Sequence, residues 1–229
     1  MEKIADSKFD SLVQKQLTGD GKCLDLDEKQ IGQAEIKRMA EMDGLTGVVQ
    51  LFLSNNQLTD RDIELLCQSE AMPNLSSLYL NHNNITDQGV KTLTGSKMAK
   101  GLTCLMLEAN NIGKVGAEVL ADCSHLDRLE ILFLDTNPVG PEGAVALATT
   151  QHLPALKDLH LDSTGIEDEG AIALAESPAS ARLRKLYLCS DHIGDRGAIA
   201  LAASARPKWL NVSSITWNRS HLFMPGLRS

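Results

Sequence analysis

The chain repeats a pair of leucines, separated by one residue, at a constant interval. The first leucine of the pair recurs every 27 residues, at Leu24, Leu51, Leu78, Leu105, Leu132, Leu159 and Leu186. A fixed period of this length means that each unit is one supersecondary element, which buries its apolar side only when neighbouring units stack on it. The pattern therefore predicts a solenoid of seven repeats.

The two halves of each unit have different periodicities. The leucine pair has the period-2 alternation of a short strand, and stacked units would join these strands into one parallel sheet with the leucines facing inward. The second half begins with Asp or Pro, as at Asp60 and Pro141, and continues with helical spacing. Because helices are wider than strands, we expect the strands on a concave face and the helices on the convex one.

Two other recurrent positions have structural interpretations. An asparagine that should hydrogen-bond the backbone of the turn follows the strand at Asn56, Asn83, Asn110 and Asn137. The same position holds Lys29, Thr164 and Asp191 in other units, and we expect Lys29 to turn outward because burying its charge is costly. Gly-Ala pairs such as Gly197-Ala198 are expected to remove bulk where the helix meets the sheet.

These residues resemble the leucine-rich repeat. The fullest unit reads Leu129-x-x-Leu132-x-Leu134-x-x-Asn137-x-Val139, followed by Gly143-Ala144-x-x-Leu147. Its second half, as in residues 170–174, is similar to the ribonuclease-inhibitor-like branch of the family. The resemblance implies an α/β leucine-rich repeat solenoid, a horseshoe with a concave parallel sheet and convex helices. A fold of this kind serves many partners, so it does not fix the function.

The repeats cover residues 23–206, and the two ends differ from them. Residues 1–22 predict an amphipathic helical cap because apolar residues recur there at helical spacing: Ile4, Phe9, Leu12, Val13 and Leu17. Residues 207–229 predict a final short strand, Leu210-Asn211-Val212, and a C-terminal cap or tail. Its Trp217, Leu222, Phe223 and Met224 would seal the last layer, which a terminal repeat otherwise exposes, or dock on a partner.

Composition narrows the class of protein and of partner. Hydrophobic residues make up 43% of the chain but aromatic ones only 3%, which indicates a core of Leu, Ile, Val and Ala. The net charge of −8 and the pI of about 5.2 disfavour nucleic acid and membrane surfaces as partners. No apolar stretch suits a membrane span or a signal peptide, and five cysteines form no Cys-x-x-Cys pair. We therefore expect a cytoplasmic protein with free thiols.

Three columns of residues should line the concave face. The central column lies between the two leucines and reads Asp25, Phe52, Tyr79, Met106, Phe133, His160, Tyr187 and Asn211. The trailing column follows the second leucine and reads Asp27, Ser54, Asn81, Glu108, Asp135, Asp162, Cys189 and Ser213. The leading column precedes the first leucine and reads Cys23, Gln50, Ser77, Cys104, Ile131, Asp158, Lys185 and Trp209. The central column thus holds four of the six Phe and Tyr residues in the chain.

Exposed rings concentrate binding energy, so this face predicts a noncatalytic module for protein–protein interaction, a scaffold, adaptor or inhibitor. The candidate protein-binding residues are Phe52, Tyr79, Met106, Phe133, His160, Tyr187, Trp209, Glu108, Asp135, Asp158 and Asp162. A partner protein or peptide with a basic segment fits best, because the carboxylates would steer it and the rings can contact cations. The alternative is that rings suit strands and that the acidic residues are only solvated surface.

Catalysis, metal binding and cofactor binding are less well supported. His160 with Asp135, Asp158 and Asp162 could hold a divalent cation, but an open face excludes little water. Cys189 is the cysteine best placed to act with His160, yet no further partner follows in a recognisable pattern. We therefore expect no catalytic residue, no metal and no cofactor.

Two other functions are implied by resemblance. Ran GTPase activators have similar repeats, which makes a small GTPase a possible partner, although the three columns contain no Arg and only loop residues such as Arg61 or Lys114 could act. Residues 84–90 look like the cysteine-type repeat of ubiquitin-ligase substrate adaptors. Those adaptors carry an additional linking motif at the N-terminus, and the 22 residues before the repeats are too few for a separate domain.

Overall fold

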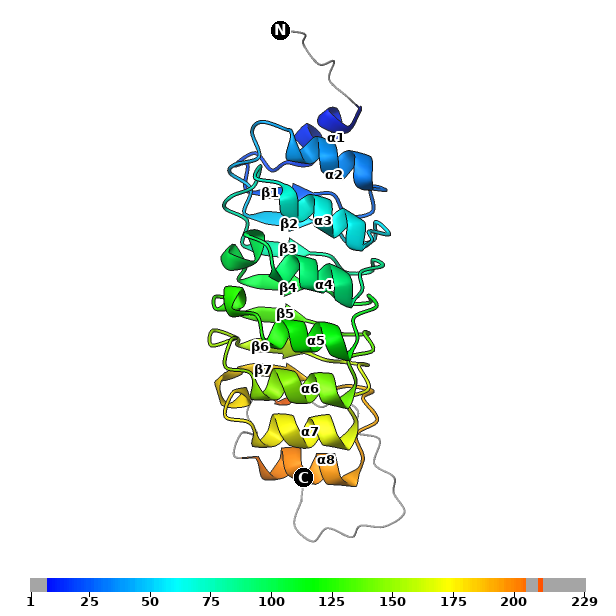
Figure 1. Cartoon of the computed structure of the whole chain (residues 1–229), viewed down its shortest axis with the longest axis vertical. Helices are drawn as coiled ribbons and strands as arrows, with labels where there is room; N and C mark the ends of the chain where they lie inside the picture. Colours follow the sequence, from blue (N-terminus) through cyan, green and yellow to red (C-terminus); the bar gives the residue numbers. More distant parts are fainter. Residues whose placement is uncertain (1–7, 205–209, 212–229) are drawn as a thin grey trace.

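The computed structural model describes residues 8–204 and 210–211 (Figure 1). One parallel sheet contains β1 (Cys23–Asp25), β2 (Gln50–Phe52), β3 (Ser77–Tyr79), β4 (Cys104–Met106), β5 (Ile131–Phe133), β6 (Asp158–His160), β7 (Lys185–Tyr187) and β8 (Leu210–Asn211), paired in chain order. The α-helices are α1 (Lys8–Gln16), α2 (Gln33–Ala40), α3 (Asp60–Gln68), α4 (Asp87–Thr94), α5 (Lys114–Ala121), α6 (Gly140–Thr149), α7 (Glu167–Glu176) and α8 (Asp195–Ala203). Short 3-10 helices are η1 (Met98–Gly101), η2 (Ser124–Leu126) and η3 (Ser180–Arg182).

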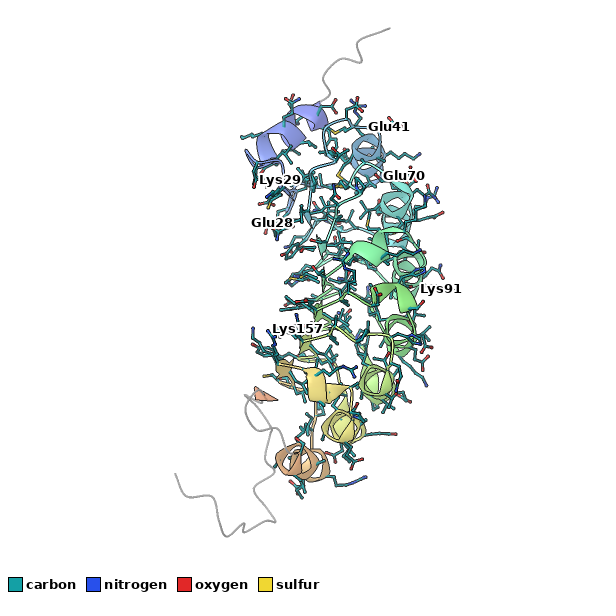
Figure 2. The ribbon with its side chains drawn as sticks, turned by 90° about the vertical axis from the view of Figure 1, so that its left-hand side faces the viewer. Glu28, Lys29, Glu41, Glu70, Lys91 and Lys157 are labelled. Carbon is teal, nitrogen blue, oxygen red and sulfur yellow. The ribbon has the colours of Figure 1, made fainter. Side chains whose placement is uncertain are left out.

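The α/β solenoid predicted from the period is confirmed. From β1 to β7 each strand residue pairs with the residue 27 positions later, as Leu24 does with Leu51. Figure 2 shows α2 to α8 along the outer, convex arc and the strands on the inner side. Within the described residues, no helix is long and apolar enough to cross a membrane.

Stacked leucines form the core. Both leucines of each repeat are at most 1% exposed, as at Leu78 and Leu80, and the described core contains no aromatic ring. Leu, Ile, Val and Ala, with a few Met and Cys side chains, therefore fill the core, as the composition indicated.

The asparagine column hydrogen-bonds the backbone of the turn, as predicted, and also joins successive turns. The amide oxygen of Asn83 accepts the N–H groups of Asn56 and Leu58, while its amide nitrogen donates to the carbonyls of Leu53 and Leu80. One side chain thus satisfies groups of two turns that would otherwise be buried without partners. Lys29 lies on the surface, as expected, and its ammonium donates to the carbonyl of Asp27.

The last member of this column departs from the pattern. One carboxylate oxygen of buried Asp191 accepts the N–H groups of Thr164 and Gly165 and the hydroxyl of Thr164. The other oxygen, Oδ2, has no hydrogen-bond partner, because it replaces the donating amide nitrogen of asparagine. Burial raises the pKa of Asp191 to about 6.

The glycines at the helix starts make contacts different from those expected. A Cβ on Gly197, of a Gly-Ala pair, would lie 2.8 Å from Asp168 Oδ1 in the preceding helix, and a Cβ on Gly89 would lie 2.5 Å from Asp60 Oδ1. The expectation that these glycines relieve packing against the sheet is therefore wrong. They let the preceding helix approach closely enough for Asp60 Oδ1 to accept the N–H of Gly89.

Helix α1 covers the first end of the stack (Figure 1). Its Val13 is buried, and Arg38 of α2 donates two hydrogen bonds to the carboxylate of Asp10, at 2.5 and 2.8 Å. Leu17 forms an antiparallel bridge with Leu24 beside β1. Several residues named above for the two ends lie outside the described residues: Ile4, Trp209, Val212, Ser213, Trp217, Leu222, Phe223 and Met224.

The substitution Gly116→Ala tests the close approach of the helices. The new Cβ would lie 2.5 Å from Asp87 Oδ1 and 2.7 Å from Ile112 Cγ2. We expect the free energy of unfolding to fall by about 1–3 kcal/mol in chemical denaturation. Gly19→Ala is the matched control because nothing lies within 4 Å of its Cβ position. A Gly116→Ala protein at least as stable as the parent would contradict this account.

Asp191→Asn restores the missing donor, and its effect should depend on pH. The folded-state pKa of about 6 lies above the ordinary 3.8, so the folded protein binds this proton more tightly than the unfolded chain. Ionisation therefore costs stability progressively from about pH 4, and fully above about pH 6. We expect the variant to exceed the parent in unfolding free energy by roughly 1–3 kcal/mol at pH 7.5 and by little at pH 4.5.

Chemical denaturation at both pH values measures this difference. Asp122→Asn, at an exposed position, should change stability equally little at each pH. An Asp191→Asn effect of the same size at pH 4.5 and 7.5 would show that the charge of Asp191 is not responsible.

Candidate functional site

The parallel register places the side chains of the central column in one row. Phe52 pairs with Tyr79, and Met106 with Phe133 on the next strands. These side chains are partly exposed, whereas the leucines on both sides of each are buried. Alternation along the strand thus turns this column to the concave face, as the sequence predicted.

The rings of this row form two stacks, and Met106 lies between them in register. Phe52 and Tyr79 have centroids 4.1 Å apart with planes inclined by 10°. His160 lies between Phe133 and Tyr187, with centroids 3.5 and 3.9 Å away. Stacking covers the inner ring faces and leaves mainly ring edges in contact with solvent. Cation contacts through ring faces are therefore restricted to the ends of the stacks, a limit that the sequence did not reveal.

His160 has a carboxylate at its edge as well as rings on both faces. Its Nδ1 lies 3.6 Å from Asp135 Oδ2, and the two side chains are only 13% and 14% exposed. A carboxylate at its edge and a ring on each face thus hold the His160 side chain within the stack of Phe133, His160 and Tyr187.

The trailing column has a structural role that the sequence analysis missed. Asp135 Oδ1 accepts the N–H of Asp162 at 2.7 Å, and Asp162 Oδ1 accepts the N–H of Cys189 at 2.7 Å. Asp27 and Asn81 accept the corresponding N–H groups of Ser54 and Glu108. The recurrence of Asp and Asn at a fixed place was the available signal. These side chains hold the turns together and also present negative charge.

The carboxylates of the other two acidic candidates, Asp158 and Glu108, face basic groups instead of backbone N–H groups. The carboxylate of Asp158 is 3.2 Å from the ammonium of Lys185, which offsets its charge. Glu108 Oε1 lies 4.0 Å from His82 Nε2 on the neighbouring repeat. On the same side, Lys157 is 2.6 Å from Glu130, and Figure 2 shows Lys157 on the strand side of the stack. The acidic character of the face is thus strongest at Asp135 and Asp162.

One cysteine of this face, Cys104, is buried. Burial raises the pKa of Cys104 to about 11, so its thiol stays protonated at neutral pH. Burial also raises the pKa of the neighbouring Tyr79. Among the described residues, no group of three or more His, Cys, Asp or Glu side chains is arranged to hold a metal ion. Trp209 of the leading column lies outside the described residues.

The two basic residues considered for GTPase activation are not on loops. Arg61 lies in α3 and its guanidinium is 2.5 Å from Glu64, while Lys114 begins α5 within 4.0 Å of Glu118 and Glu142. Their assignment to loops was therefore wrong, because α3 begins at Asp60 and α5 begins at Lys114.

A comparison with protein families agrees with the repeat pattern. A family model described as Leucine Rich repeat matches residues 71–93 and 152–175. Each match spans one strand and most of the helix after it, β3 with α4 and β6 with α7. No curated protein sequence matches the chain.

A comparison with solved structures finds similarity at low sequence identity. An internalin from Listeria monocytogenes has a TM-score of 0.56 and 21% identity over 84% of this chain and 48% of the internalin. The second structure, Leiomodin-1 actin-binding site 2, has a TM-score of 0.44 and 21% identity over 55% of this chain and 78% of its own. The chain thus spans about half the length of the internalin. At 21% identity the likeness to the internalin shows a common fold alone.

Two substitutions at Asp135 separate its structural role from its charge. Asp135→Ala removes the acceptor of the Asp162 N–H and should lower the free energy of unfolding by about 1 kcal/mol. Asp135→Asn keeps a side-chain oxygen and should leave the stability within roughly 0.5 kcal/mol of the parent. Thermal and chemical denaturation measure both. Equal losses in the two variants would mean that the carboxylate charge, and not the hydrogen bond, stabilises the fold.

Proposed function

We propose that this chain, a leucine-rich repeat protein by its repeats and its solenoid fold, is a noncatalytic protein–protein interaction module of the cytoplasm. As a scaffold, adaptor or inhibitor, it would bind a segment of another protein across the concave face. The observation that carries this proposal is the in-register row of ring edges on that face. Apolar rings on a sheet surface bury more area when a partner covers them.

Stacking also prepares the rings for binding. Each ring in a stack is held by a neighbour 3.5 to 4.1 Å away, so its rotamer is largely fixed before a partner arrives. Rigid aromatic side chains lose little conformational entropy on association. Met106, between the two stacks, adds a flexible apolar side chain that adapts to the shape of the partner.

Charge favours a basic segment as the occupant. Asp135 and Asp162 each use one oxygen for a backbone N–H, which leaves the negative charge of each at the face. Glu108 follows β4, the strand next to β5, and the net charge of the whole chain is −8. These carboxylates would accelerate the approach of Lys or Arg side chains and orient them beside the stack of Phe133, His160 and Tyr187.

We assign the repeats to the ribonuclease-inhibitor-like branch as part of this proposal. The Gly-Ala pair at the helix start supports this assignment. A Cβ on Gly143 would lie 3.0 Å from the Cβ of Ala117 in the preceding helix. No contact among the described residues specifically favours GTPase activation or ubiquitin-ligase adaptor function.

The test compares two sets of substitutions. One variant carries Tyr79→Ala, Phe133→Ala and Tyr187→Ala; the matched control carries Val115→Ala and Ile199→Ala on the convex helices, where these side chains are 54% and 47% exposed. Proteins captured from a cell extract by the native chain should be retained by the convex control. We expect the ring variant to bind them at least about tenfold more weakly, measured by calorimetry with each recovered protein.

Circular dichroism of the ring variant confirms that it is folded before binding is compared. If the folded ring variant retains the same proteins with unchanged affinity, the concave row is not the binding site. In the same assay, raised salt should slow association of the partner; a rate independent of salt would remove the basic segment from the proposal.

A further inference from the structure

A second surface, at the first end of the solenoid, has charge of the opposite sign. A cavity of about 480 Å³ lies between α1 and the first turn after β1. Its wall is formed by Lys8, Phe9, Leu12, Lys15, Lys29 and Ile31. We call it the end groove. In a chain of net charge −8, three lysines around one cavity are a local reversal of charge.

The packing of α1 fixes the orientation of this groove. Asp10 and Val13 point into the protein, where Arg38 holds the Asp10 carboxylate. Lys8 and Lys15 lie seven residues apart on the other side of the helix, with Leu12 between them. The helix therefore presents two ammonium groups and an apolar side chain to the groove.

Lys29 supplies the third charge, from a position where the next four repeats have asparagine. In those repeats the amide nitrogen donates to a carbonyl of the preceding turn, as Asn56 does to Leu26. No repeat precedes the first one, so that donor has no such carbonyl to satisfy there, and the fold does not require Asn. Lys29 is exposed, and Figure 2 shows it next to α1.

The groove joins this charge to an apolar surface. Phe9 and Leu12 are only partly buried against the core, while Ile31 is almost fully buried. Glu35 is the acidic residue in the wall, and its Oε2 already accepts the N–H of Gly32 at 3.1 Å. Positive charge therefore prevails around an apolar floor.

We propose that the end groove binds an acidic peptide segment with an apolar anchor residue. The anchor side chain would pack on Phe9 and Leu12, and the flanking carboxylates would pair with the lysines. This surface is separate from the concave face and does not depend on the function proposed for that face. The protein would thus hold a basic segment along the sheet and an acidic segment at its end.

The probe is a fluorescein-labelled peptide, Glu-Glu-Leu-Glu-Glu-Phe-Glu-Glu, titrated with the full chain and followed by anisotropy. Lys15→Glu with Lys29→Glu should weaken binding by about tenfold or more. The control, Lys91→Glu with Lys100→Glu, makes the same change in net charge at exposed positions outside the groove. It should retain most of the affinity. Figure 2 shows Lys91 on the convex side.

A second peptide, with Leu and Phe replaced by Ser, tests the apolar anchor and should bind at least about tenfold more weakly. The ring variant described above should bind the first peptide as the native chain does. The proposal is overturned if both lysine pairs weaken binding equally, if the Ser peptide binds as well, or if the native chain does not bind the first peptide at all.

Discussion

The structure depends on the transfer of backbone hydrogen bonds from each turn of the chain to the next. A strand of three residues cannot bury its apolar side or satisfy its own polar groups, so every turn requires its neighbour. Asn83 accepts from the turn before it and donates to two turns, and Asp162 accepts the N–H of Cys189 in the turn after it. On the helix side, Asp168 accepts the N–H groups of Gly194 and Gly197. Short polar side chains at three recurrent positions, in the repeats that carry them, hold successive turns in one register.

That register produces the concave site. Rings 27 residues apart stack because each lies opposite its counterpart on the next strand, with no insertion between them. The same geometry gives Asp135 two functions, since one oxygen holds a backbone N–H while the other lies near His160. The regularity required for stability therefore also organises a rigid, acidic, aromatic surface. A substitution of Asp135 therefore affects both binding and stability. Only a residue that preserves the hydrogen-bond acceptor would spare the stability.

Departures from the repeat occur where a turn lacks the usual neighbour or contact. At the first turn Lys29 is free of the bridging role and lines the end groove. In the seventh turn Asp191 keeps the acceptor of asparagine and loses its donor, which leaves a buried oxygen without a partner. The two cases differ in consequence because Lys29 is exposed and Asp191 is buried. A polar atom without a partner costs stability only when water cannot reach it.

The sequence by itself determined the architecture. A constant period and alternation within each strand specify the solenoid, the inward leucines and the outward central column, because all of these follow from local geometry repeated at one interval. The tertiary structure decided what each side chain meets: the stacking of His160 between two rings, the pairing of Asp158 with Lys185, the approach of Gly89 to Asp60, and the groove beside Lys29. These contacts join residues on different turns or elements. A local pattern fixes the direction of a side chain, whereas its neighbours depend on how the turns pack.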